Sequence, residues 1–175
     1  MSPTAQPTTP AAPAVPDSWQ VVTSPSGDVR VAAPADLGVI EIPDGVLLQG
    51  HMVAGVTPVQ IWATDASDAW SQPAAGDSLA AWLRASGWLP SGGSGGVTET
   101  ADESERVVFL PAGRALEVSV IAQPGTPEPS RVIAYAIETA DGFAVLQIVG
   151  HPTVFEDRSA DLSLITRLVS FGEDP

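Results

Sequence analysis

The feature that most constrains this fold is a pair of strand patterns joined by a tight turn signal near the C-terminus. Residues 131–139 (RVIAYAIET) and 143–150 (FAVLQIVG) are rich in β-branched and aromatic side chains, and Ala-Asp-Gly at 140–142 separates them. Asp-Gly is favoured in hairpin turns, because these turns need backbone conformations with positive φ. The sequence therefore predicts an antiparallel hairpin over residues 131–150, and with it an antiparallel sheet.

Residues 106–123 extend the same sheet. RVVFLP (106–111) is a short strand pattern, and residues 113–123 alternate apolar side chains with the polar Glu117 and Ser119. A period of two places polar side chains on one side of a strand and apolar side chains on the other. The pattern predicts a strand at 113–123 with one buried face and one wet face, the wet face carrying Glu117 and Ser119.

The first half of the chain holds shorter strand patterns and one loop-rich stretch. Strand-forming residues bounded by turn residues predict strands at 19–24, 28–34, 46–52 and 58–64. Residues 34–45 contain two prolines and two glycines, which predicts a loop or a single helical turn.

Helical spacing of apolar side chains occurs in two places. Residues 77–87 have Asp77 or Ser78 as the N-terminal cap and Gly87 as the stop, and residues 159–171 form the second helical pattern. Strands in neighbouring runs, broken by one helix in mid-chain and one at the end, are typical of an α+β fold. We expect an antiparallel β-sheet covered by helices.

The start of the chain differs from the rest in composition. MSPTAQPTTPAAPAVP carries no charge, and proline recurs at every third position from Pro7 to Pro16. This period matches the turn of a polyproline II helix, and such a segment has too little apolar surface to fold by itself. The sequence predicts a disordered Pro/Thr/Ala-rich tether over residues 1–17 and a single domain over residues 18–175.

Threonines among these prolines resemble an O-glycosylated stalk of the kind that separates a domain from a cell-surface anchor. A merely flexible tail is the alternative interpretation. On the stalk interpretation we expect an extracytoplasmic protein, secreted or in the cell envelope, with a signal sequence and an anchor ahead of Met1. The other interpretation is a cytoplasmic partner-binding protein that starts at Met1.

Charge and composition argue against several classes of partner. The chain has 21 acidic and 7 basic residues, for a formal net charge of -14. Nucleic acids and anionic membrane surfaces attract clustered basic residues, whereas the arginines here are single and scattered. The absence of cysteine excludes disulfides and thiolate chemistry, and no apolar run has the length of a membrane span. The acidity favours solubility.

Four segments form a recognisable order along the chain: W-x-x-V-x-S-P-x-G-D-x-R from Trp19, FLPAGRA at 109–115, RVIAYAI at 131–137 and DLSLITRLVSF at 161–171. Taken in this order, they resemble the PsbP-like family, which includes PsbP and related small bacterial surface lipoproteins. The resemblance implies an α/β/α sandwich with an antiparallel sheet. It also implies a non-enzymatic binding or accessory role, and it supplies no catalytic residues to transfer.

The sequence contains matches to catalytic motifs, but their context and spacing do not fit an active site. Residues 92–96 match G-x-S-x-G, yet they follow a helix in a glycine-rich run and not a strand, so we expect a flexible loop. His51 and His151 lack the spacing of a zinc site. A hydrolase assembled in space from carboxylates or from a Ser/His/Asp set is the alternative function.

The acidic clusters do not have the spacing of a calcium loop. One cluster holds Asp65 and Asp68, and the other holds Glu99, Asp102, Glu103 and Glu105. A calcium loop needs regularly spaced oxygen ligands around a sharp glycine turn. We therefore expect solvated loops at both places, and neither a metal nor a cofactor in this protein.

Tryptophan is the residue type that most suggests binding. The chain has five, namely Trp19, Trp62, Trp70, Trp82 and Trp88. The helical spacing predicts Trp82 in the core, whereas tryptophans in loops are enriched at interaction hot spots. We hypothesise a binding patch made by Trp62, Trp70 and Trp88 that takes a protein or a small apolar or lipid-like ligand. Ordinary packing is the alternative role.

Overall fold

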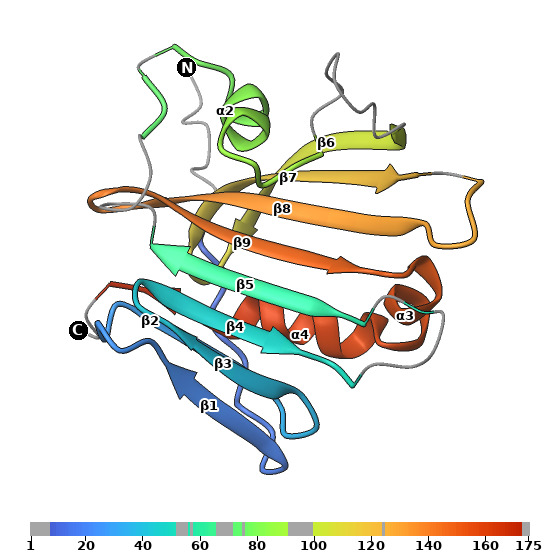
Figure 1. Ribbon diagram of the computed structural model, residues 1–175. Helices are drawn as coiled ribbons and strands as arrows, with labels where there is room; N and C mark the ends of the chain where they lie inside the picture. The colour runs from blue at the N-terminus through green and yellow to red at the C-terminus, as the bar shows by residue number, and fades with distance from the viewer. Residues whose placement is uncertain are drawn as a thin grey trace.

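Two antiparallel sheets and three helices make up the described part of the chain (Figure 1). The computed structural model describes residues 8–51, 56, 58–65, 72–74, 76–90, 100–123 and 125–172. The larger sheet has seven strands, in the spatial order β3 (Gly38–Ile42), β4 (Gly45–Gln49), β5 (Gln60–Asp65), β9 (Gly142–Gly150), β8 (Ser130–Thr139), β7 (Gly113–Ala122) and β6 (Thr100–Leu110). The smaller sheet has the order β1 (Trp19–Thr23), β2 (Val29–Pro34) and β10 (Val169–Phe171).

The hairpin predicted around residues 140–142 is confirmed. Strands β8 and β9 pair antiparallel from Thr139↔Gly142 to Arg131↔Gly150. Gly142 has a φ of +139°, which disfavours a side chain at this turn. The backbone N–H of Phe143 donates to Oε1 of Gln72 over 2.9 Å, which ties the hairpin to the segment before the mid-chain helix.

Three helices accompany the sheets: α2 (Leu79–Ala85), α3 (Pro152–Asp157) and α4 (Ser159–Leu168). Helix α2 lies within the predicted range, and its N-cap is Ser78, whose side chain accepts from the backbone N–H of Ala81. Gly87 follows it with a φ of +81°, as the predicted stop requires. Helix α3 was not predicted; Pro152 at its first turn and His151 as its cap start it.

One face of the larger sheet packs against α3, α4 and the smaller sheet. Val31 of β2, Ile61 of β5, Ile148 of β9 and Ile165 of α4 belong to one buried apolar cluster. Figure 1 shows α4 behind the plane of β4 and β5. The smaller sheet thus covers part of the larger sheet, for which helices alone were predicted as the cover.

The opposite face of the larger sheet packs against α2. Trp82 and Leu83 of this helix are buried with Val118 of β7 and Val145 of β9. The predicted core position of Trp82 is confirmed, since its exposed fraction is 7%. The observed fold therefore has two antiparallel sheets and few helices, and both faces of the larger sheet contribute side chains to buried apolar clusters.

The prediction of a wet face on strand 113–123 is wrong. Glu117 and Ser119 are only 8% and 5% exposed. The alternation itself is present, but the polar side of the strand faces the side of the sheet that α3 and α4 cover, so both faces are shielded from water. An alternating pattern shows which side chains share a face and leaves open what lies against it.

Three boundaries also differ from the prediction. Residues 34–45 contain the edge strand β3, because residues 38–42 pair with β4 between the two turns. The last helix ends at Leu168, and Val169 turns extended to pair with Val31 of β2. Strand β6 begins at Thr100, so Asp102, Glu103 and Glu105 lie on an edge strand and not in the predicted loop; charged side chains on an edge oppose pairing with other chains.

Two glycines of the β3–β4 hairpin differ in the space around them. A Cβ on Gly45 would lie 2.4 Å from the carbonyl oxygen of Ala63, whereas one on Gly38 would lie 3.6 Å from the nearest atom, the carbonyl oxygen of Gln49. We expect Gly45→Ala to lower the free energy of unfolding by about 1–3 kcal/mol, and Gly38→Ala by about 0.5 kcal/mol or less. Urea unfolding measures both, and equal effects would contradict the close approach at Gly45.

Candidate functional site

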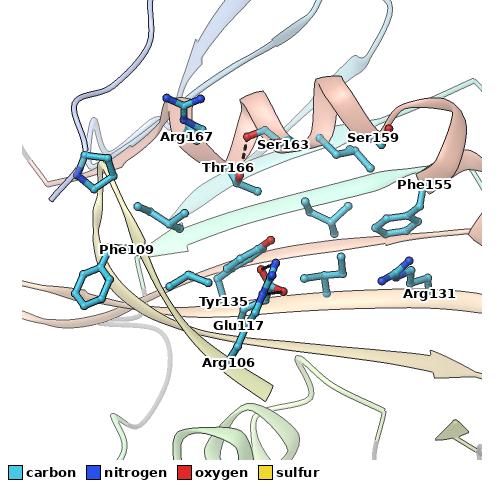
Figure 2. Close-up of a pocket in the computed structure, with 16 residues that line it drawn as sticks. Arg106, Phe109, Glu117, Arg131, Tyr135, Phe155, Ser159, Ser163, Thr166 and Arg167 are labelled. Carbon is cyan, nitrogen blue, oxygen red and sulfur yellow. Dashed lines mark hydrogen bonds and ion pairs between the residues drawn. The ribbon is translucent and has the colours of Figure 1, made fainter. Parts of the chain in front are cut away.

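A cavity of about 390 Å³ lies between α4 and the face of strands β6 to β9 that α4 covers (Figure 2). Phe155 of α3 stands at one end, and Ser159, Leu162, Ser163 and Thr166 of α4 line its helical wall. The volume falls within the range of small-molecule sites, which is about 300–1,000 Å³.

The floor of the cavity carries a row of three polar side chains from adjacent strands. Arg106 of β6 is in register with Glu117 of β7, and Glu117 is in register with Tyr135 of β8. Residues opposite each other on neighbouring strands point to the same face. Figure 2 shows the three side chains together, facing the cavity.

The Arg106–Glu117 pair is bidentate. Nε of Arg106 donates to Oε1 of Glu117 over 2.7 Å, and Nη2 donates to Oε2 over 2.9 Å. The side chain of Glu117 is 10% exposed and that of Arg106 is 69% exposed. Taking a carboxylate out of water is costly unless a cation and hydrogen bonds accompany it. Arg106 therefore makes the burial of Glu117 tolerable, and Glu117 raises the pKa of the Arg106 guanidinium above its usual value.

Tyr135 completes this row. Burial raises the pKa of its hydroxyl well above the ordinary value, and the charge of Glu117 and a hydrogen bond to it raise the pKa further. The hydroxyl is therefore neutral over the physiological range and serves as a hydrogen-bond donor on the cavity floor.

Two further arginines line the cavity. Nε of Arg131 lies 3.4 Å from Oγ of Ser119, and its guanidinium carbon lies 5.6 Å from the centre of the Phe155 ring. Arg167 belongs to the last turn of α4, at the other end of the cavity (Figure 2). Within the described parts of the chain, neither arginine forms an ion pair with a carboxylate.

The N-terminal segment borders this site. Pro10 lines the cavity, while Ala12, Pro13 and Val15 line a neighbouring groove of about 290 Å³ that shares Arg167 with it. Pro13 and Pro16 are half-buried, as expected if one ridge of a three-residue repeat faces the domain. Disorder of the tether over residues 1–17 stays a prediction.

The tryptophans of the predicted patch lie away from this cavity. Trp62 and Trp88 pack edge to face with ring centroids 6.1 Å apart, and both join the cluster under α2. Trp62 is half-buried and Trp88 is 5% exposed. Trp70 lies outside the described residues. A binding role for the three stays a prediction.

Neither histidine lines the cavity. His151 caps α3, where its Nδ1 accepts from the backbone N–H of Thr153 over 3.3 Å. His51 borders a separate hollow of about 200 Å³ beside Arg158, which pairs with Asp36 and lowers the pKa of that carboxyl. The G-x-S-x-G match at residues 92–96 lies outside the described residues.

The structure describes some residues of the two acidic clusters and not others. Glu103 pairs with Arg84 of α2, and Asp102 occupies a β-bulge with a φ of +51°. Asp68 and Glu99 lie outside the described residues. Among the described residues, no group of three His, Asp or Glu side chains is close enough together to hold a metal ion. In the same part of the chain, no helix is long and apolar enough to cross a membrane.

The cavity residues were not predicted as a site from the sequence. Each of Arg106, Glu117 and Tyr135 looks ordinary in its own strand, and only the register of three strands brings them into one row. A signal was present in Glu117, a charged residue between the apolar neighbours Leu116 and Val118. Its partner could not be read from the sequence without the sheet order.

Tyr135 is the only tyrosine of the chain, so its ionisation can be followed directly by absorbance. The folded-state pKa is raised above the unfolded value of 10.0, so this group stabilises the fold below about pH 10 and that stabilisation is lost as the pH rises further. We expect no tyrosinate absorbance near pH 10 in the folded protein and half-ionisation near pH 10 in urea. Titration near pH 10 in the folded state would contradict the buried placement.

Arg106 and Arg114 provide a matched pair of substitutions. Arg106→Gln leaves Glu117 buried without its cation and should cost about 1–3 kcal/mol of stability. Arg114 pairs with Glu138, whose side chain is 41% exposed. Arg114→Gln should therefore cost less than about 1 kcal/mol. Urea unfolding at neutral pH compares the two, and an equal loss would show that the Arg106–Glu117 pair behaves as a surface pair.

Comparison with known proteins identifies the fold. No protein-family model matches the sequence, and no curated protein matches it. Among solved structures, cyanobacterial PsbP (CyanoP) from Synechocystis sp. PCC 6803 is similar, with a TM-score of 0.52 and 7% sequence identity. The match covers 88% of this chain and 92% of that chain. The expected resemblance is confirmed at the level of the fold: the chain has the PsbP-like fold.

Proposed function

We propose that this protein is a non-enzymatic binding or accessory domain whose ligand occupies the cavity between α4 and strands β6 to β9. The observation that carries the proposal is the cavity itself, where apolar side chains such as Ile133, Ile148 and Leu162 lie beside polar groups from the sheet and from α4. Sites for small molecules combine these features. The PsbP-like fold of CyanoP agrees with such a role.

The proposed location is extracytoplasmic, with the domain held on its Pro-rich tether. The uncharged proline repeat up to Pro16 supports a spacer, and Pro13 lines the groove next to the cavity. Protease treatment of intact cells that make the full-length protein tests the location. Release into the medium, or digestion of the domain on intact cells or on spheroplasts, supports it, and digestion only after lysis of the spheroplasts contradicts it.

A hydrolase is the weaker candidate. It requires a nucleophile, a base and an orienting group within hydrogen-bond reach of one another. His151 is engaged with Thr153 in capping α3, and the hollow beside His51 is lined mainly by apolar residues and Arg158. A contact surface around Trp62 on the other face of the sheet stays a second proposal.

The fluorescent probe N-phenyl-1-naphthylamine, which is apolar and neutral, tests the cavity. Ser163 lines the cavity from an exposed position on α4, and Ala160 is exposed on the same helix without lining the cavity. We expect the wild type and Ala160→Trp to bind the probe with the same affinity. Ser163→Trp should weaken binding about tenfold or more, because the indole fills the entrance.

The probe is excited where tryptophan does not absorb, and thermal melting checks that both variants fold. Absence of probe binding to the folded wild type would overturn the proposal. Equal binding by Ser163→Trp and Ala160→Trp would place the ligand elsewhere on the molecule.

A further inference from the structure

We propose that the cavity binds an anionic amphiphile, that is, a carboxylate, sulfate or phosphate group attached to a short apolar body, with Arg131 as the partner of the anion. This inference rests on the proposed function and specifies its ligand. Three lines of observation support it: the local charge, the fixed position of Arg131 and the shape of the walls.

The cavity is locally basic in an acidic protein. Three of the seven basic residues line it together with one carboxylate, whereas the whole chain has a net charge of -14. Because Glu117 holds Arg106 through both carboxylate oxygens, the charges of this pair offset each other. Arg131 and Arg167 are the cations left to attract a ligand.

The other described ion pairs strengthen this contrast. Arg84 pairs with Glu103, Arg114 with Glu138 and Arg158 with Asp36. None of these three arginines lines the cavity. Most arginines of this chain thus pair with a carboxylate. Arg131 and Arg167 line the cavity without such a partner among the described residues, so their guanidinium groups can bind an anionic ligand.

Arg131 is held in place for such a role. The ring of Phe155 stacks against its guanidinium at 5.6 Å, and Ser119 is within hydrogen-bonding distance of its Nε. Cation–π contact and a hydrogen bond orient the planar group at little further entropic cost on binding. Arg167 is exposed at the opposite end, so it contributes long-range attraction more than direct contact.

The lining and the volume of the cavity determine what apolar body the ligand carries. Ile133 and Ile148 from the sheet face Leu162 from α4, so the middle of the cavity is apolar. A volume of about 390 Å³ is at the lower end for ligand sites, which suits a single short chain or ring and excludes a two-chain lipid. Glu117 is saturated by Arg106, so it does not recruit a cationic headgroup.

Displacement of N-phenyl-1-naphthylamine by ligands of one chain length tests the charge preference. Decyl sulfate, decyl phosphate and decanoate supply the anion, decanol removes the charge and decyltrimethylammonium reverses it, all below their micellar concentrations. We expect at least one anion to bind about tenfold more tightly than decanol, and the cation to bind more weakly than decanol. Added salt should reduce the difference.

Substitutions locate the anion. Arg131→Gln should lower the affinity for the preferred anion about tenfold and leave that for decanol unchanged, while Arg131→Lys should restore most of the loss. Arg167→Gln should lower the affinity for the preferred anion only about twofold. Arg114→Gln, which removes the same charge outside the cavity, should change neither affinity.

Several results would overturn the inference. If decanol binds as tightly as every anion, the site is purely apolar. If inorganic sulfate or phosphate, which has no apolar body, displaces the probe, the site is a simple anion site. Binding to vesicles with anionic lipid, without binding of the free amphiphiles, shows a membrane surface as the partner. If the probe binds while the charge preference is absent, the proposed function stands and this inference falls; if the probe itself does not bind, both fall.

Discussion

The antiparallel pairing of β5 with β9 is the contact on which the rest of the structure depends. It runs from Gln60↔Val149 to Asp65↔Ala144 and joins the β3–β5 meander to the β6–β9 meander in one sheet. The paired residues are far apart in the chain, so their association has to overcome a large loop-closure entropy. Ile61 and Ile148, both about 1% exposed, provide the apolar burial that offsets it.

The two faces of this sheet differ in the elements that cover them and in how polar they are. The face under α2 carries a cluster of apolar side chains, and the Trp62–Trp88 pair belongs to it. The face under α4 also contributes to the core but retains a cavity where polar side chains from β6 to β8 meet helical residues. A buried carboxylate such as Glu117 destabilises a fold unless it is paired. Glu117 meets this requirement through its bidentate pair with Arg106 and its hydrogen bond with Tyr135.

Much of the fold was readable from local patterns. The hairpin at residues 140–142, the capped helix after Ser78 and the strands around 19–34 follow from turn residues, caps and alternation, which act over a few positions. Strand β3 was hidden by its flanking prolines and glycines, and β10 was merged with the preceding helix because Val169 fits the apolar stripe of either element. The cavity could not be predicted, since its residues come from separate elements.

The sequence by itself determined which side chains share a face, where the chain turns and that an uncharged proline-rich segment precedes an α+β domain. The tertiary structure alone decided that the polar face of β7 is covered, that Arg106, Glu117 and Tyr135 form one row, and that Arg131 lies against Phe155. The physical reason is that alternation encodes the side of a strand on which a residue lies. Which strand pairs with it, and what packs above it, depend on contacts between residues distant in the chain.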